Sequence, residues 1–482
     1  MRQTTLSVPL EVKPESCSRL CALIDELRRE EESSPLGLPE EYARIARDVP
    51  ALHFMSMSVF TAADYDPLFI LEANFDGPAG PFWGQLEAAL GEKLRGLLRC
   101  CKQPLDRDDL LFEAVTARGS RAPVAPYLEA RAQRPSVYFH GNRGMSRDRI
   151  LSEEALFHGI RDVLKGANKG GPSPFRGAPA ASVHAGLRDA LLPRFPWLAE
   201  AAPKRIGAME SVTDWIKLLL FAVAVLLALA LPGFLILLAF DAARALIWGG
   251  SPLDFAADWR PVTRIIVLGV LGLILTLLIL VLWLRHLERR DSSQDAPRVN
   301  EQRLREMVRR EDWIAQNHMG SIVLIKPGVL RTIIIHAGHL GLGLFTRAFP
   351  RYRQGYLGSM RTVHFAHWAF LNNGSRLLFF SNFDHSWDSY LDDFIEKAAV
   401  GLTLAWGSGV GFPPTRFLVL DGASHGRRFK NWALASRAVS RFWYSAYKDL
   451  TVDQIERNHR IANGLRRRSM TEEEAAAWML DL

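Results

Sequence analysis

Two long apolar runs dominate the hydropathy pattern of the chain. Residues 218–240 and residues 265–284 contain no charged side chain. At about 1.5 Å per residue, each run is long enough to cross a hydrocarbon core of roughly 30 Å. Two buried helices in a large soluble core are the alternative, but uncharged runs of this length are rare in soluble proteins. We therefore predict a two-helix transmembrane hairpin within residues 212–290, with a lipid bilayer as the first partner.

Basic residues flank this hairpin outside both predicted spans. They are Lys204, Arg205 and Lys217 before the first span and Arg285, Arg289 and Arg290 after the second. Residues 241–262, in the loop between the spans, carry two arginines and three aspartates. Because positive residues stay on the cytoplasmic side, the pattern predicts a multi-pass protein of the inner (cytoplasmic) membrane with both termini cytoplasmic.

The rest of the chain alternates between strand-like and helix-like periodicity in two soluble halves. Each half is expected to contain strands and helices in the order β-α-β-β-α-β, followed by a closing helix. The predicted segments are an N-terminal domain (1–165), a Gly/Pro-rich linker (166–211), the hairpin (212–290), a linker with an amphipathic helix (291–316) and a C-terminal domain (317–482). Residues 110–116 are assigned to a strand and residues 321–325 to the first strand of the second half.

The two halves repeat the same short motifs in the same order. The matching pairs are Lys13-Pro14 with Lys326-Pro327, His53-Phe54 with His364-Phe365, Asn74-Phe75-Asp76 with Asn382-Phe383-Asp384, and the helix caps Ser146 and Thr451. Chance similarity is the alternative, but both order and spacing hold. The predicted fold class is α+β: tandem ferredoxin-like domains, arranged as a pseudo-dimeric α/β barrel, that flank the hairpin.

Charge and cysteine content narrow the functional classes. The formal net charge of +7 suits attraction to the anionic cytoplasmic leaflet, and no nucleic-acid-binding signature accompanies it, so nucleic acid is not expected as a partner. The four cysteines have no C-x-x-C spacing, which favours a reducing compartment. Phosphate-binding loops, serine-hydrolase elbows and zinc-protease motifs are not found.

The element order and the duplication resemble the dimeric α/β-barrel superfamily, which includes dye-decolorising peroxidases, chlorite dismutases and small monooxygenases. The chain also resembles uncharacterised bacterial two-span membrane proteins that share the Asn382-Phe383-Asp384 and Trp387–Phe394 segments. Dye-decolorising peroxidases carry a G-x-x-D-G motif whose aspartate lies over the haem. The nearest run here is Ala73–Gly77, in which Asp76 matches the aspartate but Ala73 replaces the first glycine.

This resemblance implies a haem-binding site. The candidate axial ligands are His336, His339 and His364, because haem iron is commonly held by a histidine in an apolar pocket. His364 and His367 are three apart on a predicted strand, so we expect them to point to opposite faces. Each histidine has a simpler interpretation as a hydrogen-bonded core residue. No cluster with metal-ligand spacing is found, so no metal site is predicted.

Acid–base chemistry near a haem would need a carboxylate and a cation. Asp76, Asp384 and Arg376 are the candidates for these roles. The alternative for both aspartates is that they end a strand and cap the following helix.

Two functions follow as expectations. The first is a membrane-anchored oxidoreductase of haem-peroxidase type, acting on an apolar or membrane-associated substrate with haem as cofactor. The second is a non-catalytic module without a cofactor, which binds a lipid or apolar small molecule or acts as a scaffold at the cytoplasmic membrane face. Transport is not expected because neither span contains a charge. The sequence leaves oligomerisation open.

Overall fold

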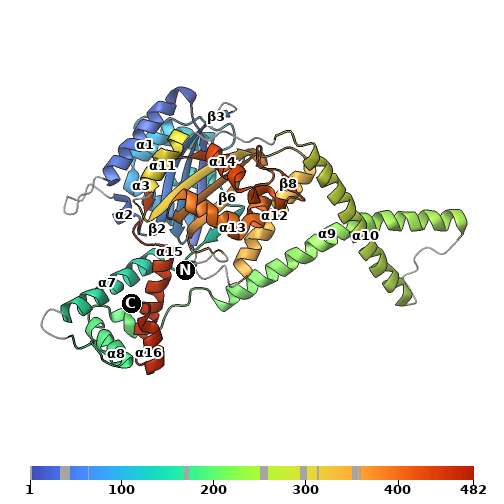
Figure 1. The fold of residues 1–482 in the computed structure, drawn as a ribbon. Coiled ribbons are helices and arrows are strands. Elements are labelled where there is room, and N and C mark those ends of the chain that lie inside the picture. Colours follow the sequence, from blue (N-terminus) through green and yellow to red (C-terminus); the bar gives the residue numbers. More distant parts are fainter. Residues whose placement is uncertain are drawn as a thin grey trace.

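Two antiparallel sheets form the centre of the protein, and two long helices extend from them (Figure 1). The computed structural model describes residues 3–32, 44–62, 65–167, 173–249, 259–293, 301–311, 314–349, 357 and 360–482. All strand pairings in both sheets are antiparallel. The α+β class predicted from the sequence is therefore confirmed.

The elements that precede residue 208 lie in the predicted N-terminal domain and in the predicted linker. The strands are β1 (Gln3–Glu11), β2 (Leu52–Ala62), β3 (Tyr65–Asp76) and β4 (Val137–His140). The helices are α1 (Cys17–Glu32), α2 (Arg44–Asp48), α3 (Ala79–Leu90), α4 (Glu92–Arg99), α5 (Asp109–Thr116), α6 (Ala125–Arg131), α7 (Arg147–Ala167) and α8 (Ala180–Leu191). Residues 110–116 were predicted as a strand, but they lie in α5, where Phe112 and Val115 face the core at helical spacing.

The elements after the membrane helices follow a similar order. The strands are β5 (Gln316–Leu324), β6 (Val363–Leu371), β7 (Arg376–Asp384), β8 (Thr415–Arg416), β9 (Leu420–Asp421), β10 (Arg437–Ala438) and β11 (Phe442–Ser445). The helices are α11 (Glu301–Glu311), α12 (Val329–Ala348), α13 (Trp387–Trp406), α14 (Gly426–Ser436), α15 (Val452–Arg466) and α16 (Glu472–Met479). Strand β5 begins five residues earlier than predicted.

Each sheet takes one strand from the other half of the chain. The first sheet has the order β1-β3-β2-β11, and the second has the order β10-β5-β7-β6-β4. Strand β11 pairs with β2, while β4 pairs with β6. The predicted boundary at residue 165 therefore does not separate two independent sheets, because the halves exchange their last strands.

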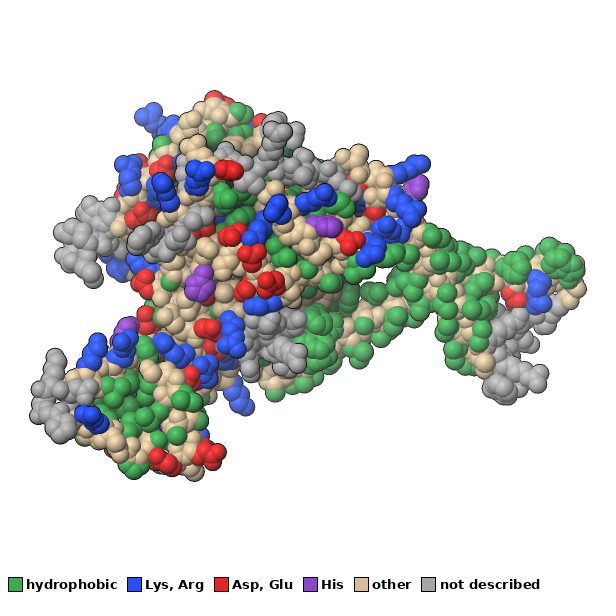
Figure 2. Space-filling model, in the orientation of Figure 1, with side chains coloured by type: hydrophobic (Ala, Val, Ile, Leu, Met, Phe, Trp, Pro, Cys, Tyr) green, Lys and Arg blue, Asp and Glu red, His purple; other side chains and the backbone are tan. Residues whose placement is uncertain are grey.

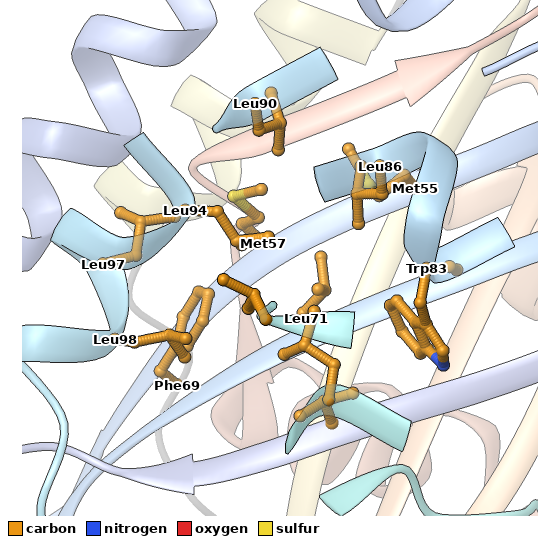
Figure 3. Close-up of a cluster of buried hydrophobic side chains, with 14 of the residues drawn as sticks. Met55, Met57, Phe69, Leu71, Trp83, Leu86, Leu90, Leu94, Leu97 and Leu98 are labelled. Carbon is orange, nitrogen blue, oxygen red and sulfur yellow. The ribbon is translucent and has the colours of Figure 1, made fainter. Parts of the chain in front are cut away.

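Strand alternation explains how each sheet buries two faces. On β2, Met55 and Met57 point outward and pack under α3 and α4, as Figure 3 shows with Phe69 and Leu71 of β3. Phe60 of β2 points the other way and packs against Phe380 of the second sheet. The two sheets therefore lie face to face, with one helix layer on each outer side.

A helical bundle lies apart from the sheets. Helices α7, α8, α15 and α16 share a hydrophobic cluster that includes Leu156, Leu187, Ile461 and Trp478 (Figure 1). Helix α8 and the 3-10 helix η2 (Pro196–Ala199) fall within residues 166–211, which were predicted as a linker. Their apolar side chains are buried in this bundle, so much of that segment is folded structure.

Three helices are long and apolar enough to cross a membrane: α9 (Ala208–Trp248), α10 (Trp259–Arg289) and α12. A hairpin of only two spans is therefore not confirmed. Only 6% of the most apolar 18-residue stretch of α9 is buried inside the protein. The corresponding share is 11% in the described part of α10 and 28% in α12. In Figure 2, hydrophobic side chains cover most of the visible face of α9 and α10. Such surfaces require an apolar environment, so the protein is a membrane protein.

Helices α9 and α10 cross at two glycines. A Cβ atom on Gly233 would lie 2.1 Å from the carbonyl oxygen of Gly272, so only a residue without a side chain fits there. The Gly233 N–H donates to Thr276 Oγ1 at 3.1 Å. This bond lies beside Pro232, whose ring interrupts the helix hydrogen bonding at that point.

Candidate functional site

A layer of polar side chains is buried between the two sheets, with Glu72 near its centre. Glu72 is on β3 and is 1% exposed. Its inward direction follows from strand alternation, because Phe69 and Leu71 occupy the outward positions of the same strand. A carboxylate in this position needs several hydrogen-bond donors, since an unpaired buried charge is very unfavourable.

Five side chains donate to or approach the Glu72 carboxylate, and one of them is Asn382, whose Nδ2 donates to Oε1 at 3.4 Å. Ser56 Oγ donates to Oε2 at 2.8 Å, and Asn74 Nδ2 donates to Oε1 at 2.8 Å. His318 Nε2 lies 2.9 Å from Oε2, and His367 Nδ1 lies 3.8 Å from Oε1. Burial alone would raise the pKa of Glu72, but the charge and hydrogen bond of His318, with His367 and Asn74, lower this pKa to about 2. Glu72 is therefore ionised in the folded protein.

The hydrogen bonds continue from Glu72 to a surface cleft. While His318 Nε2 faces the carboxylate, the other ring nitrogen, Nδ1, lies 2.8 Å from Ser440 Oγ and is hydrogen-bonded to it. Ser440 follows β10 in the short connection to β11, where the chain passes from one sheet to the other. The result is a line of carboxylate, imidazole and hydroxyl groups that ends at the surface.

Ser440 lines an open cleft of about 510 Å³ at the seam between the two sheets, which we call the seam cleft. Its wall includes Arg28, Asp25 and Arg441, and Arg441 Nη1 donates to Asp25 at 2.9 Å. Arg28 Nε is buried without a hydrogen-bond partner, and its nearest ion-pair partner, Glu32, is 4.0 Å away. The cleft therefore combines the two guanidinium groups of Arg28 and Arg441 with Ser440, the hydroxyl at the end of the buried network.

Two histidine–aspartate pairs occupy equivalent places at one end of the layer. His53 Nε2 lies 3.1 Å from Asp76 Oδ2, and His364 Nε2 lies 2.7 Å from Asp384 Oδ1. The pairs connect to a shared residue, because Tyr447 Oη is 2.8 Å from His53 Nδ1 and its ring also packs near His364. These contacts match the motif pairs found in the sequence.

β-bulges set the direction of both histidines. The register of β2 against β3 shifts between Leu52 and Phe54, and that of β6 against β7 shifts between Val363 and Phe365. The sequence predicted that His364 and His367 would point to opposite faces. This prediction is wrong: the bulge breaks the alternation, so both rings reach the layer between the sheets.

Asp76 and Asp384 also cap helices. The backbone N–H of Arg147, in the first turn of α7, donates to Asp76 Oδ2 at 2.8 Å. The N–H of Val452 at the start of α15 donates to Asp384 Oδ2 at 2.8 Å. The sequence suggested a cap on the helix that follows directly, but Ser386 caps α13. The aspartates instead join each sheet to a distant helix of the bundle.

Arg376 lies far from the aspartates. It begins β7 while Asp384 ends it, which separates the two by about 26 Å along the strand. The Arg376 guanidinium stacks over the ring of Tyr65 at 4.0 Å. The structure therefore does not bring Asp76, Asp384 and Arg376 together as one acid–base site.

The three predicted haem ligands do not fit that role. Both ring nitrogens of His339 are hydrogen-bonded, to Ser136 Oγ at 2.9 Å and to the carbonyl of Ala405 at 3.1 Å. The exposed ring of His336 lies against Phe370, with its Nδ1 on a carbonyl of its own helix. His364 is closed in by its aspartate and aromatic neighbours. The three rings point to separate places, and none lines the seam cleft.

Comparisons give no relative from which to transfer a role. The chain matches no model of a protein family, no curated protein and no solved structure. Within the described residues, no group of three or more His, Cys, Asp or Glu side chains is arranged to hold a metal ion.

Sequence reasoning missed Glu72, His318 and Ser440. One signal was present, since Glu72 is the single charged residue in the mostly apolar segment 68–75, LFILEANF. A charge in such a run suggests a buried partner. Nothing near Ser440 or His318 in the sequence indicates that they meet, because they are 122 positions apart along the chain.

Proposed function

We propose that this protein is a membrane-anchored module that binds a small anionic ligand in the seam cleft. The observation that carries this proposal is the hydrogen-bonded line from Ser440 through His318 to Glu72 behind a cleft of about 510 Å³. This volume lies within the range of small-molecule sites. The cleft wall is polar and charged, which favours a polar ligand over the apolar molecule expected from the sequence.

Arg28 is the main anchor in this proposal. It lines the cleft with a side chain that is 32% exposed, and its ion pair with Glu32 is long, at 4.0 Å, so its guanidinium can donate to a ligand carboxylate or phosphate oxygen. Arg441 adds a second guanidinium, which Asp25 holds in place on the same wall. The buried network fixes Ser440 at the floor, so the site would be largely formed before the ligand arrives.

The finer architecture is also part of the proposal. The two halves are ferredoxin-like copies, a view supported by equivalent bonds: Gln3 Nε2 donates to the carbonyls of Asn142 and Met145, and Gln316 Nε2 donates to the carbonyls of Tyr447 and Leu450. Both soluble halves, with their termini, lie on the cytoplasmic face of the inner membrane. The basic residues that flank α9 and α10 support this orientation.

The ligand proposal predicts an anion-dependent rise in melting temperature. Citrate and pyrophosphate are suitable probes because each offers several charged oxygens. At 100 times its dissociation constant, a probe that binds only the folded state adds about 2.7 kcal/mol, which should raise the melting temperature of the detergent-purified full chain by several degrees. Arg28→Gln should abolish this rise.

The exposed Arg468 provides the matched control. Arg468→Gln removes the same charge outside the cleft and should keep the full response. If neither probe shifts the wild-type protein, or if both variants lose the response equally, the ligand site is not at Arg28.

A second candidate function is hydrolysis of a small ester at Ser440. The order carboxylate, imidazole and serine hydroxyl is the arrangement that activates a nucleophile. Ser440 Oγ would bond to the ester carbonyl carbon while His318 Nδ1 takes the hydroxyl proton. The alcohol would leave with that proton as the ester C–O bond breaks, and water would then release the acid by the same route in reverse.

This candidate predicts covalent labelling of Ser440 by a fluorophosphonate reagent. The serine oxygen would displace fluoride from phosphorus, and peptide mass spectrometry would locate the adduct. Ser440→Ala should remove the adduct, and Glu72→Gln should slow its formation by tenfold or more because the imidazolium loses its partner. Ser436, which lines the same cleft but bonds to Ser321, is the control position. Labelling that survives Ser440→Ala, or no labelling of wild type, would eliminate the candidate.

A further inference from the structure

The membrane-side end of α9 is fixed to the soluble part by a buried carboxylate. Asp214 is 2% exposed and forms ion pairs with two arginines, Arg143 at 2.9 Å and Arg347 at 3.1 Å. Arg347 belongs to the last turn of α12. Apolar contacts continue along the same line, with Trp215 against Phe349. The first turns of α9 are therefore held by the C-terminal end of α12.

The last turn of α10 is fixed in a corresponding way. Asp291, just past the helix, pairs with Lys326 at 2.7 Å and with Arg331 at 3.3 Å, and Arg331 lies in the first turn of α12. Glu288 accepts from the backbone N–H groups of Phe417 and Leu418 at 3.1 and 2.9 Å. The end of α10 is therefore held by the N-terminal end of α12.

Helix α12 therefore links the start of α9 to the end of α10. Arg331 and Arg347 are sixteen residues apart, which corresponds to about 24 Å along a helix. The same two membrane helices touch each other at Gly233 and Gly272, and α12 also packs against α9, where Gly341 lies beside Phe221. Because a chain that crosses and returns has the start of α9 and the end of α10 on one membrane face, both ends of α12 lie at that face.

We propose that α12 lies in the plane of the membrane interface and does not cross it, and that acyl chains of that leaflet cover its free apolar side. Exposed apolar side chains on α12 include Ile333 and Leu340, which are 59% and 53% exposed. Val329, at the start of the same helix, is 72% exposed. The opposite side of α12 packs against the soluble core, where His339 is hydrogen-bonded to Ser136 and to the carbonyl of Ala405.

Crossing by α12 would break these contacts. Its two terminal arginines would have to lie on opposite membrane faces, and Asp214 or Asp291 would lose a buried partner. Breaking a buried ion pair is strongly unfavourable. The third apolar helix is therefore a docking element that seats the sheets on the bilayer, in the manner of an interfacial amphipathic helix.

Depth measurement by spin labels tests this placement. Single cysteines at Ile333 and Leu340 would be introduced into the full chain with its four native cysteines replaced, and the protein reconstituted in nanodiscs. Leu278, in the middle of α10, serves as the deep reference, and the exposed Leu111 of α5 serves as the water reference. The readout is the ratio of collision rates with oxygen and with a nickel complex.

Both α12 labels should give similar, shallow depths between the two references. A crossing helix would instead place positions seven residues apart about 10 Å apart in depth. Ratios equal to that of Leu111 at both sites would mean that α12 faces water. Either of these two results would overturn the proposal.

Discussion

Replacing Glu72 by glutamine is expected to lower the free energy of unfolding by about 3 kcal/mol at neutral pH, because the amide removes the buried charge that holds His318. The fall of the Glu72 pKa from 4.5 to about 2 corresponds to a stabilisation of this order. Denaturant unfolding of the detergent-purified protein, followed by tryptophan fluorescence, would measure the change.

The same substitution should alter the acid sensitivity of the fold. The folded-state pKa of Glu72 is depressed, so its contribution is complete above pH 4.5 and is lost as pH falls toward 2. Burial lowers the pKa of His367 from 6.5 to about 4, so the unfolded state takes up this proton first and stability also falls between those values. Glu72→Gln should remove the loss below pH 4.5 and leave a loss between pH 6.5 and 4.

Glu92 supplies the control for Glu72. It is 64% exposed at its side chain and pairs with Arg99, so Glu92→Gln should cost less than about 1 kcal/mol and leave the acid profile unchanged. An equal cost at both positions would show that the central network contributes little to stability.

Asp384→Ala is expected to destabilise the protein by about 3 kcal/mol or more. The change leaves His364 buried without its ion-pair partner and removes the acceptor for the first turn of α15. Asp76→Ala should have a similar effect, because Asp76 makes the matching contacts with His53 and α7. Thermal and denaturant unfolding of the two variants would measure both losses.

The two aspartate variants also test the internal repeat. Asp388 is the matched control: it is 57% exposed, lies four residues after Asp384 and pairs with Lys430 at 2.7 Å. Asp388→Ala should cost less than about 1 kcal/mol. If Asp76→Ala and Asp384→Ala differ by more than about 2 kcal/mol, the two halves do not use these residues equivalently.

The internal repeat could be recognised in the sequence because its motifs occupy equivalent positions in the two halves. His53 with Asp76 and His364 with Asp384 recur at nearly the same separation, and the structure joins each pair directly. Their exact role could not be read, because the cap acts on α7 and α15, dozens of residues away. Short-range patterns identify candidate caps but not which helix receives them.

The candidate site also shows the difference between what the sequence indicates and what only the tertiary structure reveals. His336, His339 and His364 were chosen because histidines in apolar segments resemble axial ligands, yet hydrogen bonds or packing occupy each ring. The seam cleft arises where β10 leads to β11 at the junction of two sheets. No local sequence pattern marks such a junction. Local sequence indicates where a strand forms, but strand exchange depends on which strands pair with each other.

The sequence by itself determined the α+β class, the apolar helices and the repeated motifs. These features depend on hydrophobic periodicity and on the length of segments without charged residues, which are local properties of the chain. Only the tertiary structure decided that the halves exchange strands, that bulges turn both His53 and His364 inward, and that α12 joins α9 to α10. These features depend on which buried charge finds which partner, and that pairing is settled only when distant segments pack together.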